Sequence, residues 1–135
     1  MDVFAYGTLT DRDRAAAVLG TDGFAFLVPA RLHGLRRVDG RYPTLAPGGE
    51  VEGRLLRTER VDALDRYEGV TDGLYVRVSV PVTERRGGHA AVYVGDPDRL
   101  DPAEPVDWPG EGSFGERVER YVEGNPVRVE EAETV

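Results

Sequence analysis

At residues 3–9 the chain reads VFAYGTL, which joins an apolar strand to a glycine turn and then to a helical segment. Gly7 permits a backbone conformation or a close ligand approach that a Cβ would obstruct. Either Thr8 or Thr10 can cap the helix expected over residues 11–19. Because a helix start carries unpaired N–H donors and partial positive charge, this junction suits a carboxylate or a developing oxyanion. Such junctions also serve structural roles, so both interpretations stay open at this point.

Length and composition predict one globular domain. The chain has 135 residues, of which 40% are hydrophobic, enough for a proper core. We expect a single domain over residues 1–135, with residues 130–135 as a flexible tail. No apolar run approaches the ~20 residues that span a bilayer, and the first strand leaves no room for a signal peptide. We therefore expect a cytoplasmic protein with no membrane partner. The absence of Cys excludes disulfides, thiolate metal sites and a Cys nucleophile.

The charge balance argues against a nucleic-acid partner. The chain has 25 acidic and 17 basic residues, a net charge of -8, and no Lys. A negative protein repels phosphate backbones. An acidic surface without Lys suits a halophilic source, because high salt screens the repulsion between carboxylates. A GC-biased genome that favours Arg explains the same composition.

The remaining pattern alternates strands and helices. A long strand is expected over residues 24–38, interrupted at Pro29 and Gly34. A loop rich in Pro and Gly follows at residues 41–49, either as a pocket wall or as a plain turn. The later elements are strands over 51–57, 74–83 and 90–94, helices over 59–68 and 114–122, and a hairpin turn at 85–88.

Glu68 occupies a position where an apolar residue is expected. Val61, Leu64 and Glu68 lie at i, i+3 and i+7 of the predicted helix, so they share one face, and Gly69 ends the helix. Burial and the negative end of the helix would both raise the pKa of this carboxyl group toward neutrality. Such a group can accept a proton and later return it. Alternatively, Glu68 turns to solvent at a frayed helix end, or it pairs with Arg66 or Arg77.

Other chemistries find little support in the residues. Ser113 lacks the glycine two positions before it that a nucleophile elbow requires. His33 and His89 do not lie at metal-ligand spacing. The glycines after the first strand fit neither a dinucleotide fingerprint nor a phosphate loop. We therefore expect no metal and no cofactor.

Two segments resemble the γ-glutamylcyclotransferase-like family, which includes the γ-glutamylamine cyclotransferases. FAYGTL at residues 4–9 resembles the family's Tyr-Gly-Ser/Thr-Leu signature. LDRYEGV at residues 64–70, followed by GLYVR at 73–77, resembles a second signature in which the Glu before Gly is catalytic. The resemblance covers roughly residues 2–94. One departure follows the first signature, where Asp11 to Arg14 replace the Asn or His that the family often carries.

The resemblance implies an α+β fold, a small mixed-sheet β-barrel with a few helices packed outside. It also implies that a γ-glutamyl amine or γ-glutamyl amino acid is cyclised to 5-oxoproline with release of the amine, without metal or cofactor. Glu68 would be the catalytic residue. The substrate would be bound by the backbone of Tyr6, Gly7, Thr8 and Leu9 and by a pocket wall that includes Tyr75.

A second hypothesis is a non-catalytic binding module that holds a small anionic metabolite in the same pocket. Anion binding would favour a neutral or basic residue at position 68, so Glu68 favours catalysis. A protein-interaction domain would need an exposed apolar patch, and the sequence shows none clearly.

Overall fold

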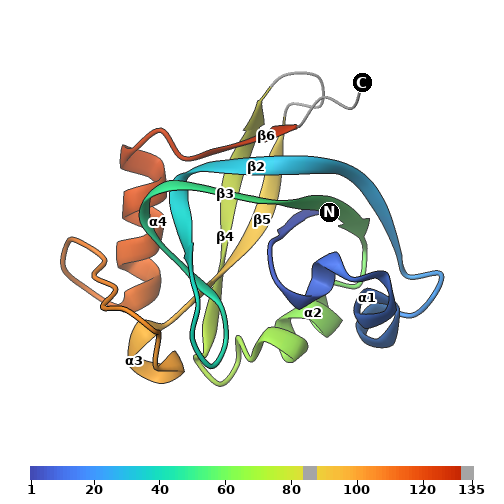
Figure 1. The fold of residues 1–135 in the computed structure, drawn as a ribbon, viewed down its shortest axis with the longest axis horizontal. Helices are drawn as coiled ribbons and strands as arrows, with labels where there is room; N and C mark the ends of the chain where they lie inside the picture. The colour runs from blue at the N-terminus through green and yellow to red at the C-terminus, as the bar shows by residue number, and fades with distance from the viewer. Residues whose placement is uncertain (84–87, 132–135) are drawn as a thin grey trace.

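A computed structural model describes residues 1–83 and 88–131 and contains a closed barrel of mixed strands (Figure 1). The described strands are β1 (Asp2–Ala5), β2 (Phe24–Val38), β3 (Thr44–Thr58), β4 (Tyr75–Thr83), β5 (His89–Gly95) and β6 (Arg128–Glu131). Around the barrel they follow the order β1-β3-β2-β6-β4-β5. The β1–β5 and β4–β6 pairs are parallel and the other pairs are antiparallel.

Helices pack outside this barrel, which confirms the expected α+β architecture. They are η1 (a 3₁₀ turn, Thr8–Thr10), α1 (Arg12–Leu19), α2 (Val61–Glu68), α3 (Pro97–Leu100) and α4 (Phe114–Gly124). In Figure 1, α1 and α2 lie beside β1, whereas α4 lies on the opposite side of the barrel. No helix within the described residues is long and apolar enough to cross a membrane.

Two hydrophobic clusters lie on the two faces of the sheet. The cluster inside the barrel includes Phe4, Leu32, Leu55, Val80 and Val92. The cluster beneath α1 and α2 includes Val3, Leu19, Leu56, Leu64 and Ala91. Because successive strand residues point to opposite faces, β1 contributes to both clusters. Each fully buried Leu or Val contributes roughly 1.5–3 kcal/mol relative to an exposed one, so the strand that precedes η1 is firmly held.

The long β2–β3 hairpin confirms the expected interruptions and corrects the expected loop. Its register shifts between Phe26 and Pro29 and again around Gly34, whose φ is +95°. The loop predicted over residues 41–49 ends earlier, because β3 already begins at Thr44. Residues 44–47 pair with the end of β2, and the buried Thr44 hydroxyl bonds to both the carbonyl (3.0 Å) and the amide (2.8 Å) of Gly95. The pairing with β2 and the hydrogen bonds to Gly95 therefore outweigh the local preference of this Pro- and Gly-rich segment for a loop.

The first helix is not capped as predicted. Asp11 is its N-cap residue, and no side chain caps it. The Thr10 hydroxyl instead donates to the Gly7 carbonyl at 2.7 Å, and Thr8 lies in the preceding 3₁₀ turn. The intervening 3₁₀ turn therefore moves both threonines away from the start of α1.

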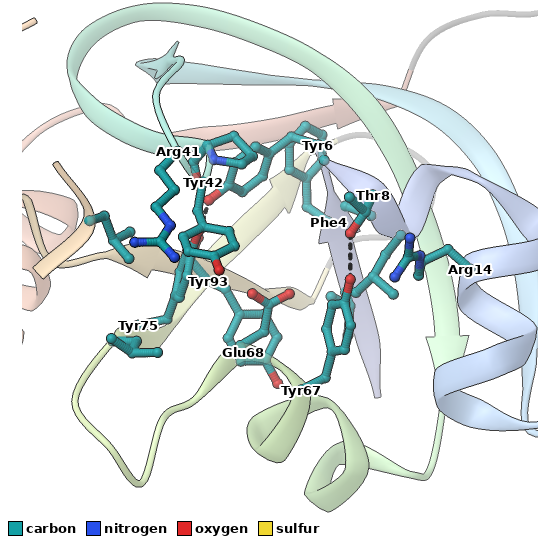
Figure 2. Close-up of a pocket in the computed structure, with 17 residues that line it drawn as sticks. Phe4, Tyr6, Thr8, Arg14, Arg41, Tyr42, Tyr67, Glu68, Tyr75 and Tyr93 are labelled. Carbon is teal, nitrogen blue, oxygen red and sulfur yellow. Dashed lines mark hydrogen bonds between the residues drawn. The ribbon is translucent and has the colours of Figure 1, made fainter. Parts of the chain in front are cut away.

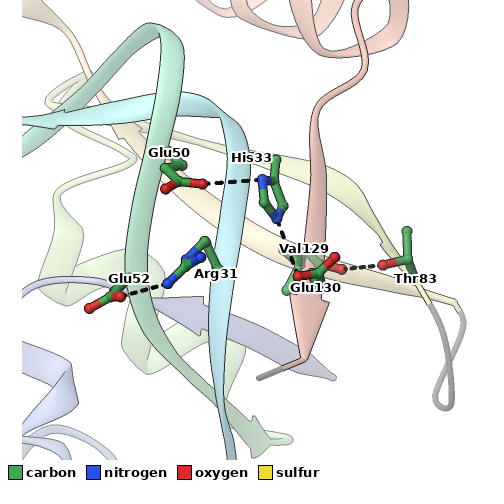
Figure 3. Close-up of polar contacts among 7 residues, drawn as sticks. All are labelled: Arg31, His33, Glu50, Glu52, Thr83, Val129 and Glu130. Carbon is green, nitrogen blue, oxygen red and sulfur yellow. Dashed lines mark hydrogen bonds and ion pairs between the residues drawn. The ribbon is translucent and has the colours of Figure 1, made fainter. Parts of the chain in front are cut away.

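The C-terminal tail also begins later than predicted. Glu130 and Glu131 belong to β6, which pairs with β2 and β4 and places Val129 in the barrel core. The Thr83 hydroxyl donates to the Val129 carbonyl at 3.3 Å, and the ring of His33 lies between Glu50 (3.4 Å) and Glu130 (3.6 Å) (Figure 3). Residues 132–135 of that tail and residues 85–87 of the predicted hairpin turn at 85–88 lie outside the described residues.

Candidate functional site

A cavity of about 590 Å³ opens where the loop after β1, the β2–β3 turn and the end of α2 meet (Figure 2). Its volume lies in the range of small-molecule sites. The walls come from segments distant in sequence, including the 3₁₀ turn, the start of β4 and the end of β5. All six residues that the sequence predicted as site residues line it, namely Tyr6, Gly7, Thr8, Leu9, Glu68 and Tyr75.

Glu68 is the last residue of α2, and its carboxylate faces the cavity (Figure 2). Gly69 ends the helix in the left-handed conformation at a φ of +70°, and Leu64 anchors the preceding turn in the core. Burial raises the pKa of the Glu68 carboxyl group from 4.5 to about 7. Within residues 1–83 and 88–131, this carboxylate has no hydrogen-bond or ion-pair partner. The carboxyl group can therefore exchange a proton near neutral pH.

The two alternative positions considered for Glu68 are not adopted. Its side chain faces the cavity rather than open solvent (Figure 2). Arg77 pairs with Asp65 at 3.2 Å instead of with Glu68, and no ion pair joins Arg66 to Glu68 within the described residues. Asp65 also accepts a hydrogen bond from the Tyr93 hydroxyl at 2.7 Å. Arg77 and Tyr93 therefore hold the middle of α2 against β4 and β5, and Glu68 has no partner in the described part of the chain.

The loop after β1 offers unused backbone donors. The N–H groups of Gly7, Thr8 and Leu9 make no hydrogen bond with any described part of the chain. The φ of Gly7 is −122°, and a Cβ there would lie 3.4 Å from the Pro43 side chain, which also lines the cavity. A Cβ at this position would therefore just touch the Pro43 side chain and narrow the cavity. The Thr8 hydroxyl lies 2.8 Å from the Tyr67 hydroxyl, which joins this loop to α2 (Figure 2).

Tyrosines form much of the cavity wall and are fixed by their hydroxyl groups. The Tyr6 hydroxyl donates to the Tyr93 carbonyl and the Tyr75 hydroxyl donates to the Pro43 carbonyl, each at 2.6 Å. Burial raises the pKa of Tyr6 and of Tyr75 well above the usual value for a phenol. Both phenols therefore stay protonated at neutral pH and act as hydrogen-bonded walls rather than as bases.

The sequence did not identify all of the cavity residues. Arg14, on the exposed face of α1, lines the cavity, although nothing in the local sequence distinguishes it from Arg12. Arg41, Tyr42 and Pro43 also line it, so the predicted loop is both a turn and a pocket wall. No group of His, Cys, Asp and Glu side chains able to hold a metal ion occurs in the part of the chain that the structure describes.

Comparison with protein families identifies the chain. A sequence model of the family "Gamma-glutamyl cyclotransferase, AIG2-like" matches residues 3–110, which include the first loop and Glu68. The chain belongs to this family. The family resemblance noted in the sequence is thereby confirmed. A search of curated proteins found no significant match.

Solved structures of the cyclotransferase fold resemble the protein along most of its length. An uncharacterized protein from Homo sapiens has a TM-score of 0.61 and 21% identity, covering 89% of this chain and 96% of that one. A protein named gamma-glutamyl cyclotransferase has a TM-score of 0.60 and 21% identity, covering 92% and 99%. A protein from Arabidopsis thaliana has a TM-score of 0.56 and 29% identity, covering 91% and 83%.

Proposed function

We propose that this member of the family is an enzyme that cyclises a γ-glutamyl amine or γ-glutamyl amino acid to 5-oxoproline and releases the amine. The observation that carries the proposal is the carboxyl group of Glu68, which is partly buried, unpaired within the described residues, directed into a cavity, and has a pKa of about 7. A general base is most effective when its pKa lies near the working pH.

In the proposed reaction Glu68 moves one proton across the substrate. It takes the proton from the α-amine as that nitrogen forms a bond with the γ-carbonyl carbon. It then gives the proton to the departing nitrogen as the original carbon–nitrogen bond breaks. The products are 5-oxoproline and the free amine, and Glu68 ends ionised, as it began.

The loop after β1 supplies the other half of the proposed machinery. Its free N–H groups at Gly7, Thr8 and Leu9 can bind the negative charge that develops on the γ-carbonyl oxygen, or a substrate carboxylate. The bond between Thr8 and Tyr67 fixes this loop relative to α2, and therefore relative to Glu68. Such fixed donors stabilise a transition state because they need no reorganisation during the reaction.

A non-catalytic module that binds a small anion is the second candidate. Arg14 and Arg41 in the cavity wall favour it, because a guanidinium group binds carboxylates well. Glu68 favours the enzyme, because a partly buried carboxylate with no partner among the described residues would weaken anion binding.

The test is 5-oxoproline release from γ-glutamyl amines, γ-glutamyl amino acids and glutathione, at low and molar salt. We expect turnover by the wild type and a kcat/KM that rises with pH through an apparent pKa near 7. Glu68→Gln should lower kcat about 10²–10⁴-fold, whereas Glu59→Gln, at an exposed position outside the cavity, should not. A folded wild type that turns over none of these compounds would favour the binding module.

A further inference from the structure

Two arginines line the cavity on opposite sides of Glu68 (Figure 2). Arg14 projects from α1 beside the loop that carries Thr8, and Arg41 projects from the β2–β3 turn. From this arrangement we propose that the site selects γ-glutamyl amino acids or peptides, with one arginine for each of two substrate carboxylates. This inference rests on the proposed function and names its substrate class.

Both guanidinium groups are available to a ligand. No described carboxylate is hydrogen-bonded or ion-paired to either of them, and Arg41 lies over the ring of Tyr42, with its Cζ 5.6 Å from the ring centroid. Other arginines of this acidic chain are engaged, as in the pairs Arg31–Glu52 (2.8 Å), Arg57–Asp2 (2.9 Å) and Arg37–Asp39 (2.9 Å).

The charge of the cavity is opposite to that of the protein. Its charged lining residues are Arg14, Arg41 and Glu68. Two guanidinium groups face one carboxyl group, so the lining carries net positive charge whether or not Glu68 is ionised, although the chain as a whole carries -8. A concave site of positive charge concentrates anions. Two separated guanidinium groups match two carboxylates better than one.

The proposed reaction requires only one carboxylate on the γ-glutamyl group, and it lies next to the attacking amine. A plain amine as leaving group would leave one arginine without a partner. An amino acid as leaving group places a second carboxylate one carbon from the departing nitrogen. The reacting atoms then lie between the two carboxylates, as Glu68 lies between the two arginines (Figure 2).

The position of each arginine in the cavity indicates which of the two substrate carboxylates it binds. Arg14 lies on the side of the free N–H groups of the first loop, so it binds the glutamyl α-carboxylate. Arg41 lies across the cavity, beside the exposed ring of Tyr42, so it binds the carboxylate of the leaving group. Both contacts use the planar guanidinium fork, which bonds a carboxylate through two parallel N–H groups.

A matched pair of substrates tests the inference. γ-Glutamylalanine and γ-glutamylethylamine differ by a single carboxylate on the leaving group. We expect kcat/KM for γ-glutamylalanine to be about tenfold higher or more, the value of one charge-assisted hydrogen bond. Arg41→Gln should remove most of this preference, whereas Arg14→Gln should lower kcat/KM for both substrates. Arg66→Gln, an exposed change on α2 outside the cavity, should alter neither.

Equal kcat/KM values for the two substrates in the wild type would overturn the inference while leaving the cyclisation intact. Preference lost in Arg14→Gln but kept in Arg41→Gln would overturn the assignment of the two sides. Failure of both compounds to release 5-oxoproline would instead refute the proposed function. In that case the Kd values of the two compounds, measured by calorimetry, test the inference. Equal Kd values for γ-glutamylalanine and γ-glutamylethylamine would refute it. Tighter binding of γ-glutamylalanine that is lost in Arg41→Gln would support it.

Discussion

Burial of Glu68 should make the folded protein less stable as the pH rises, and Glu68→Gln should remove this effect. The pKa of the carboxyl group is about 7 in the folded chain, against 4.5 for an unperturbed glutamate. Between these two values the folded state binds more protons than the unfolded state, so raising the pH favours unfolding. The stability associated with the neutral group is fully present below pH 4.5 and is lost as the pH passes 7.

The size of the effect follows from the pKa difference. A change of one in pKa corresponds to about 1.4 kcal/mol, so the rise from 4.5 to about 7 corresponds to about 3 kcal/mol at pH 8. Glutamine has the shape of the neutral carboxyl group and carries no charge to desolvate. Glu68→Gln should therefore unfold at nearly the wild-type temperature at pH 4 and roughly 10 °C higher at pH 8.

Thermal unfolding followed by circular dichroism at pH 4, 6 and 8 measures the difference in unfolding temperature between Glu68→Gln and the wild type. Because both proteins share every other titrating group, their difference isolates position 68. Glu59→Gln, which removes an exposed carboxylate, should show no pH-dependent gap. A constant offset across this pH range, or a variant less stable than wild type at pH 8, would refute the claim that burial controls the Glu68 pKa.

Three further outcomes are expected. Tyr67→Phe removes the 2.8 Å bond to Thr8 and should lower kcat/KM several-fold with less than about 1 kcal/mol lost in denaturant unfolding. Gly53→Ala should cost more than about 2 kcal/mol, because its Cβ would lie 2.1 Å from the Ala5 carbonyl; Gly124→Ala, with no neighbour within 4 Å, should be neutral or stabilising by the same measurement. If the composition reflects a saline source, the unfolding temperature should rise steeply with molar KCl, and indifference to salt would favour the genomic explanation.

Local patterns predicted the main elements because they report local physics. The alternation of valines over residues 76–82 requires one buried strand face, and the structure places Val78, Val80 and Val82 in the barrel core. Gly69 ends α2 because it adopts the left-handed conformation without a Cβ penalty. The helical stripe of Leu64 and Glu68 indicated a carboxylate on the apolar face but left a solvent-facing side chain open, and the structure shows it partly buried and facing the cavity.

Elements that depend on distant partners were predicted less well. The segment that begins at Thr44 was expected to be a loop by its Pro and Gly content, but pairing with β2 and the bonds to Gly95 make it a strand. Glu130 resembles part of a charged tail, yet its strand completes the barrel between β2 and β4. In both cases hydrogen bonds to remote strands outweigh local preference.

By itself the sequence determined the family, the order of most elements, and an acidic residue on an apolar helix face after a Tyr-Gly-Thr-Leu loop. Only the tertiary structure decided that Glu68 faces a cavity without a partner in the described chain, and that Arg14 and Arg41 flank it. The physical reason is that desolvation and charge depend on neighbours brought together by barrel closure. Arg14 and Arg41 belong to different elements, so no local pattern could pair them across one cavity.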